Sequence, residues 1–208
     1  MTEPREKRRS ALLRAARDVF VTHGYQDARI EQIAAKAGVG KGTFYLYFKD
    51  KRAIYAELVD GLFQRLRAAI LDVDSKGDIE SQVRHNIRAL IAVITEDAPF
   101  ARSLMWLGAG LDPQFTGTIR GFHRDVHRVL AQALRDGQAL GVVAEGDPDL
   151  FATFAIGALK EVVLQADDHA TPARRELLTG ALFDILQRGM LRVPSAGVPH
   201  EGGRARHR

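Results

Sequence analysis

The chain has 208 residues, of which 46% are hydrophobic and 27% charged, which suffices for one large domain or two small ones with a substantial core. It contains no cysteine, which excludes a disulfide framework and a thiolate metal site, and no apolar run long enough for a transmembrane helix. No apolar signal-peptide core follows the basic N-terminus, so we expect a cytoplasmic protein without membrane contact.

The net charge of +4 is unevenly distributed along the chain. Residues 1–52 hold 12 Lys and Arg against 6 Asp and Glu, residues 53–187 hold 13 against 19, and residues 188–208 hold 5 against 1. This pattern fits a basic nucleic-acid-binding head, a mildly acidic body and a basic tail. Ordinary solvated faces explain it equally well.

Two amphipathic helices are predicted at the start of the chain. The first spans residues 5–23 and ends at Gly24, and the second is short and ends at Gly38. Their apolar faces consist of Leu12, Leu13, Ala16, Val19 and Phe20 in the first helix and of Ile30, Ile33, Ala34 and Ala37 in the second.

The stretch 38–51 predicts a turn, a helix of about two turns and the start of another helix. Lys41 and Gly42 stand at the beginning of that short helix, where a cation opposes the macrodipole and a glycine costs about 1 kcal/mol relative to alanine. Both choices suit a large anion that approaches this end closely. Phe44 and Phe48 are four residues apart and predict an inward face. The pattern is that of a helix-turn-helix.

Residues 5–52 resemble the DNA-binding head of the TetR family of bacterial transcriptional regulators. The positions that carry the resemblance are Ala16, Phe20, Gly24, Tyr25, Ile33, Ala34 and the run from Ala37 to Lys51. The resemblance implies a three-helix head joined by a long helix to a helical body that binds an effector and dimerises. It also implies a double-stranded DNA operator, which we expect to be palindromic.

By this resemblance, one set of residues is expected to contact DNA. Lys41 and Thr43 would reach base edges, the Gly42 backbone would lie close to the duplex, and Leu46 would meet a thymine methyl group. The expected set is Arg29, Gly40, Lys41, Gly42, Thr43, Tyr45, Leu46, Tyr47 and Lys51. The alternative for the two tyrosines is half-buried packing.

Three positions in the head depart from the family pattern. Ala28 and Arg29 replace the usual hydroxyl residues that cap the second helix and touch phosphate, and Gly40 stands where serine is frequent. Asp27 can supply the cap instead, and Arg29 can contact phosphate by its charge.

Helix-start signals recur through the body, and no stretch alternates with period two. Asp50 and Asp78 are N-caps, and Pro99, Pro113, Pro148 and Pro172 stand at first helical positions. We predict helices over about 51–74, 79–96, 99–107, 113–140, 148–167 and 172–189. The fold class is all-α with about nine helices, divided into a head (1–52), a body (53–192) and a disordered basic tail (193–208).

The last two predicted helices carry apolar stripes too wide for one-sided burial. We expect them to meet their copies in a homodimer as a four-helix bundle, while an intrachain core remains the alternative. The expected interface residues are Phe151, Phe154, Ala155, Ala158, Leu159, Val162, Leu178, Leu182 and Ile185.

An effector pocket is expected in the body, for an unknown small molecule of apolar or aromatic character. The candidates are His85, Phe100, Met105, Trp106, Phe115 and Phe122. His123 and His127 have the spacing of half a metal site, but a solvated or hydrogen-bonded pair is the preferred interpretation, and we expect neither a metal nor a cofactor.

The sequence therefore predicts a sequence-specific, effector-responsive transcriptional regulator, with repression as the expected mode. It lacks a Gly-rich nucleotide loop, a Gly-x-Ser-x-Gly elbow and a cysteine nucleophile, so we do not expect an enzyme. The alternatives are an all-helical small-molecule-binding protein or enzyme, and a non-specific architectural DNA binder.

Overall fold

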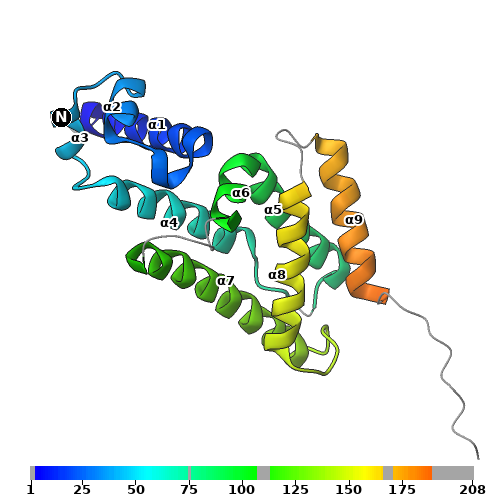
Figure 1. The fold of residues 1–208 in the computed structure, drawn as a ribbon. Helices are drawn as coiled ribbons and strands as arrows, with labels where there is room; N and C mark the ends of the chain where they lie inside the picture. Colours follow the sequence, from blue (N-terminus) through cyan, green and yellow to red (C-terminus); the bar gives the residue numbers. More distant parts are fainter. Residues whose placement is uncertain (1–2, 75, 107–112, 166–170, 189–208) are drawn as a thin grey trace, which may run out of the picture.

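The computed structural model describes residues 3–74, 76–106, 113–165 and 171–188, and within them it is all-α, as predicted (Figure 1). The helices of the head are α1 (Glu3–Asp27), α2 (Ile30–Lys36) and α3 (Lys41–Tyr45). Those of the body are α4 (Lys51–Ala69), α5 (Ile79–Glu96), α6 (Ala98–Trp106), α7 (Pro113–Ala139), α8 (Pro148–Gln165) and α9 (Pro172–Arg188). None of the helices in the described residues is long and apolar enough to cross a membrane. The predicted tail lies outside the described residues.

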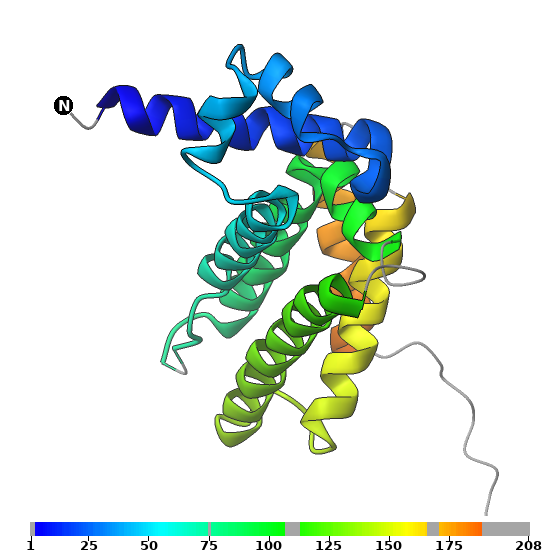
Figure 2. The same cartoon turned by 60° about the vertical axis from the view of Figure 1, so that its left-hand side comes forward.

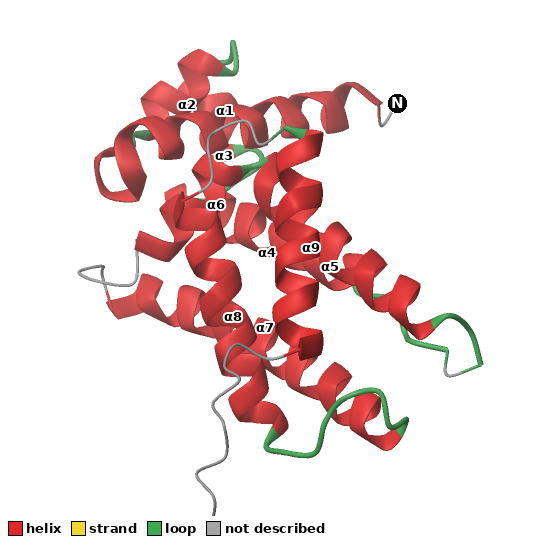
Figure 3. Cartoon of the chain, turned by 90° about the vertical axis from the view of Figure 1, so that its right-hand side faces the viewer, coloured by secondary structure: helices red, strands yellow, loops and turns green. Residues whose placement is uncertain are grey.

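The body is built from helix pairs around α4. Helix α5 packs against α9, α7 packs against α8, and α4 contacts both α5 and α7 (Figure 2). Helices α8 and α9 lie on the same face of the molecule (Figure 3). Helix α4 therefore leads from the head into the middle of the body.

Aromatic rings join the head to the body. Tyr55 on α4 is fully buried, and its ring centroid lies 4.9 Å from that of Phe20 and 5.0 Å from that of Tyr25, both on α1. On its other side the centroid of Phe100, on α6, is 5.9 Å away. The buried cluster of the head includes Phe100 and Leu104 of α6, so head and body share one core across the boundary predicted at residue 52.

A charged contact supports the same junction. The Arg17 guanidinium on α1 donates two hydrogen bonds to the Asp97 carboxylate between α5 and α6, and the Nε–Oδ2 distance is 2.5 Å. The hydrogen bond to Asp97 raises the pKa of Arg17. Asp97 also accepts a hydrogen bond from the backbone N–H of Phe100, at 3.3 Å. The start of α6 is thus tied to the first helix of the head.

Most predicted helix boundaries are confirmed, and two elements are shorter than predicted. Helix α4 ends at Ala69 instead of residue 74, because the Asn86 side chain of α5 bonds both backbone groups of Leu71 (3.1 and 2.8 Å) in place of a continued helix. Helix α3 covers five residues, fewer than the two turns predicted. The first helix is predicted to end at Gly24. Gly24 has φ 73° and ψ 167° and forms a kink there, and α1 continues beyond it to Asp27.

Candidate nucleic-acid interface and effector cavity

A glycine turn positions α3 on α2. Gly38 has φ 69°, a conformation that only glycine adopts easily. Its N–H donates to Ala35 O at 3.1 Å and that of Val39 donates to Ala34 O at 2.9 Å, which is the Schellman pattern of a helix C-terminus. Val39 packs against the head core. The direction of α3 is therefore fixed by backbone bonds and one apolar contact.

Two phenylalanines anchor the inner side of α3 and leave its outer side free. Phe44 and Phe48 are 0% and 4% exposed, whereas Tyr45 and Leu46 are 48% and 74% exposed. A leucine so exposed beside a tyrosine has no packing explanation within the described residues. Tyr47 is half-buried and packs partly against the head core. The outward surface thus consists of Lys41, Gly42, Tyr45 and Leu46, with Thr43 and Tyr47 partly covered.

The glycine at position 42 has no explanation inside the described part of the chain. Its φ is not positive, and a Cβ atom added there would meet nothing within 4 Å. The same holds for Gly40, the N-cap of α3, which makes no side-chain cap hydrogen bond. Both glycines leave open space at the N-terminal end of α3, where a partner could approach the backbone.

An ion pair holds the Lys41 side chain over the turn. Its Nζ donates to the Glu31 carboxylate of α2, and both side chains are exposed. This hydrogen bond lowers the pKa of Glu31 and raises that of Lys41. Any anion that Lys41 contacts must therefore compete with Glu31.

Lys51 has a structural task that the sequence did not indicate. Its Nζ donates to the carbonyl oxygens of Tyr25, Gln26 and Ala28 at 2.6, 2.9 and 2.8 Å, and lies 4.7 Å from the centroid of the Tyr25 ring. Burial lowers the pKa of this amino group. All three donors of the ammonium group are occupied. In this arrangement Lys51 ties the start of α4 to the end of α1 and to Ala28 before α2, and it does not present a donor for phosphate.

The cap of α2 differs from the one predicted. The N-cap is Arg29, not Asp27, and its N–H donates to Gln32 Oε1 at 2.8 Å. Ala28 is 2% exposed and belongs to the head core, so a small apolar side chain suits that position. The Arg29 side chain is exposed.

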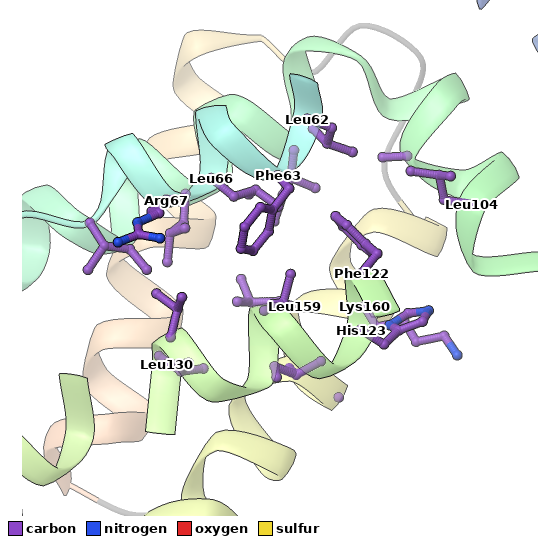
Figure 4. A pocket seen from close by; sticks show the side chains of 18 of the residues that line it. Leu62, Phe63, Leu66, Arg67, Leu104, Phe122, His123, Leu130, Leu159 and Lys160 are labelled. Carbon is purple, nitrogen blue, oxygen red and sulfur yellow. The ribbon is translucent and has the colours of Figure 1, made fainter. Parts of the chain in front are cut away.

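The body contains a cavity of about 320 Å³ lined by residues of α4, α5, α6, α7 and α8 (Figure 4). Its walls are mostly apolar, and Arg67, His123, Thr153 and Lys160 are its polar lining residues. The apolar lining residues are Leu62, Phe63, Leu66, Ile70, Leu90, Ile94, Ala101, Leu104, Phe122, Val126, Val129, Leu130, Ile156, Gly157 and Leu159.

Comparison with known proteins identifies the family that the head of this chain matches. Residues 12–58, which contain the helix-turn-helix, match the family described as bacterial regulatory proteins, tetR family. The helix-turn-helix head of this chain therefore matches the DNA-binding head of tetR-family regulators.

Proteins similar to this chain extend the likeness beyond the head. The uncharacterized HTH-type transcriptional regulator YdgC of Bacillus subtilis is 29% identical over 160 residues, which are 74% of this chain and 78% of YdgC. FadR of Bacillus subtilis, solved with stearoyl-CoA, has 23% identity and a TM-score of 0.71 over 88% of this chain and 99% of that chain. AibR, solved with isovaleryl coenzyme A and operator DNA, has 16% identity and a TM-score of 0.68 over 86% and 97%.

Within this TetR fold, the cavity collects few of the residues predicted for it. Phe122 lines it and its ring centroid lies 6.2 Å from that of Phe63. Phe100 instead packs in the head core, and His85 is exposed and outside the lining. The side chains of Met105, Trp106 and Phe115 lie outside the described residues. The leucines of α4 went unrecognised because lining and core residues share the same apolar periodicity.

His123 and His127, which have the spacing of half a metal site, lie in different surroundings. His123 lines the cavity, whereas His127 Nε2 lies 3.0 Å from Asp149 O and 3.1 Å from Thr153 Oγ1. Loss of water around the ring, followed by the charge of Lys160, lowers the pKa of His123. Among the described residues no three His, Asp or Glu side chains gather in a way that could hold a metal ion.

The residues predicted for the dimer interface divide into three groups. Leu159, Leu178 and Leu182 are partly buried and pack against the buried cluster of Ile87, Ile91 and Phe183, so only part of each side chain is open to a second copy. Phe154 and Ile185 are 66% and 47% exposed, and Ala158 is exposed too. Leu150, Leu177 and Leu186 are further apolar side chains exposed on α8 and α9, at 48%, 60% and 57%. Phe151, Ala155 and Val162 are half-buried.

Proposed function

We propose that this protein is a homodimeric transcriptional repressor that binds a palindromic operator and is released when a small molecule with an apolar chain occupies the cavity. The head would contact DNA through the exposed side of α3 and the start of α2. The contact residues that we propose are Arg29, Gly40, Lys41, Gly42, Thr43, Tyr45, Leu46 and Tyr47. Lys51 is left out because its ammonium group is bonded to three carbonyl groups.

One observation carries the regulatory part of the proposal. Leu62 of α4 and Leu104 of α6 belong to the buried core of the head and also line the cavity. A ligand that moves these two side chains therefore disturbs the packing that orients α1 and α3. Closely packed interiors transmit such displacements instead of absorbing them.

The size of the change in operator affinity depends on how differently the effector binds the two conformations of the protein. The effector shifts operator affinity only by the ratio of its affinities for the DNA-binding and released conformations. Couplings in proteins are typically about 5-fold to 150-fold. A cavity shared between head core and body is consistent with a coupling in this range.

Two structural neighbours support an acyl effector. FadR of Bacillus subtilis was solved with stearoyl-CoA and AibR with isovaleryl coenzyme A. The cavity in this chain has apolar walls and polar groups at its ends, which fits an apolar chain that carries a polar head.

The exposed apolar side chains on α8 and α9 support the dimer. Phe154, Leu177 and Leu186 are each more than half exposed, and a two-fold axis beside them would bury both copies of this face. A dimer places two heads on one duplex, which accounts for the expectation of a palindromic operator.

A mobility-shift titration against the DNA upstream of the protein's own gene tests the DNA-binding part. We expect a complex that requires both halves of a palindrome and survives an excess of unrelated DNA. Equal affinity for all DNA would indicate an architectural binder instead. Absence of any complex at low salt would indicate a small-molecule-binding protein or an enzyme.

A further inference from the structure

The basic side chains of the cavity stand at opposite ends. Figure 4 shows Arg67 on one side and His123 and Lys160 on the other, with Phe63 and Leu159 between them. No Asp or Glu is among the described lining residues. The cavity thus combines an apolar interior with cations at its rims.

Lys160 has no counter-ion in the described residues. The positions three and four residues away on α8 are Ile156, Gly157, Val163 and Leu164, none of which is acidic. Several other cations of the body are paired: Arg65 with Glu96, Arg88 with Glu176, and Arg135 with Asp149. An unpaired cation beside apolar walls is costly to dehydrate unless an anion meets it.

Arg67 at the other end has a local explanation. It stands in the last turn of α4, where the negative end of the helix dipole favours a cation. Lys160 lies in the interior of α8, away from either helix end, so no such effect accounts for it.

We propose that the end of the cavity formed by Lys160 and His123 binds the anionic head of an amphiphile whose apolar chain fills the cavity. Lys160 supplies the charge from α8, and His123 supplies a ring N–H from α7 as a hydrogen-bond donor. Burial lowers the pKa of His123, which favours the neutral ring, so Lys160 is the cation at this end. The head can be a carboxylate or the phosphates of a thioester carrier. This assignment rests on the proposed acyl effector.

Isothermal titration calorimetry with three probes of equal chain length tests the assignment. The probes are dodecanol, used below its solubility limit, and sodium dodecanoate and lauroyl-CoA, each used below its critical micelle concentration. We expect both anionic probes to bind the wild-type protein about tenfold or more tightly than dodecanol. The order of dodecanoate and lauroyl-CoA identifies the preferred head.

Two variants locate the head. Lys160→Gln should reduce the affinity for the preferred anionic probe about tenfold and leave that for dodecanol unchanged. Arg67→Gln is the matched control, because it removes the same charge at the opposite end. It should keep the preference for anionic probes. Both side chains are exposed, so both variants should unfold at the wild-type temperature.

The outcomes separate this assignment from the function on which it rests. Equal binding of all three probes, or loss of the anionic preference in Arg67→Gln but not in Lys160→Gln, overturns the head assignment and leaves the acyl effector standing. If none of the three probes binds, both the head assignment and the proposed acyl effector are overturned.

Discussion

Gly42 has no intramolecular reason to be glycine, and this makes it a clean probe of the DNA surface. Gly42→Ala should leave the free energy of unfolding unchanged or raise it by up to about 1 kcal/mol, because alanine is the better helix former. Operator affinity should fall, since the added methyl group occupies space at the DNA-facing end of α3. Thermal unfolding and fluorescence anisotropy measure the two effects.

Gly61 on α4 is the matched control for that substitution. A Cβ atom there also meets nothing within 4 Å, and its φ is not positive. Gly61→Ala should raise stability by a similar amount without changing operator affinity. If both alanine variants bind DNA as the wild type does, the backbone of Gly42 does not approach the duplex.

The ion pair between Glu31 and Lys41 predicts an inhibitory carboxylate. Glu31→Gln should tighten binding to operator and unrelated DNA alike, because Lys41 no longer has a competing partner and a negative charge leaves the surface. Anisotropy at several salt concentrations measures this change. Glu80→Gln, which breaks the Arg84 pair on α5, alters the net charge equally and should have little effect. Unchanged affinity in Glu31→Gln would remove Lys41 from the proposed contacts.

At the scale of elements, Lys51 joins α4 to the end of α1. Lys51→Gln should lower the free energy of unfolding by about 2 kcal/mol, because charged hydrogen bonds to three carbonyl groups are lost. Operator affinity should fall with the loss of head structure, but the salt dependence of binding should stay the same. Chemical denaturation and an anisotropy salt series measure both quantities.

The contrasting result would restore a phosphate role for Lys51. If the salt slope in Lys51→Gln fell by about 0.9 with stability unchanged, the ammonium group would be releasing its carbonyl partners to bind a phosphate. Lys41→Gln serves as the reference, because an exposed cation at the DNA surface should show that loss of slope.

The helices themselves were largely predictable because their ends are chemically marked. Asp50 and Asp78 accept hydrogen bonds from the backbone of Ala53 and Ser81, and proline opens α7, α8 and α9. The end of α4 was not predictable, because it depends on Asn86 from another helix. Local signals fix starts, whereas this end is fixed by a tertiary contact.

The two sites were predictable to different degrees. The outward residues of α3 follow from the inward pair Phe44 and Phe48, whose burial the spacing predicted. The cavity did not follow, because an apolar residue such as Leu62 or Leu104 lines it and packs in the core at once. Sequence spacing gives the apolar face of a helix but not the place where two faces fail to meet.

At the scale of the whole molecule, the outer face of α8 and α9 predicts the oligomeric state. Phe154→Asp should convert the proposed dimer to a monomer, because a charge would be buried at its interface. Sedimentation velocity measures this change. Operator affinity should fall with it, because one head then contacts one half-site.

Leu71→Asp is the control for a charge on an exposed apolar position. Leu71 is 55% exposed and follows the C-terminus of α4, so it belongs to neither α8 nor α9. The Leu71→Asp substitution should leave the oligomeric state unchanged. A monomeric wild-type protein, or a dimer that persists in Phe154→Asp, would place the interface elsewhere or remove it.

Operator affinity with and without lauroyl-CoA tests the central claim, that the cavity and the head core act as one unit through Leu62 and Leu104. Fluorescence anisotropy of a labelled operator fragment should show a fall in affinity of between about 5-fold and 150-fold at saturating lauroyl-CoA. Unchanged operator affinity, with calorimetry showing lauroyl-CoA bound to the same protein, would contradict the claim.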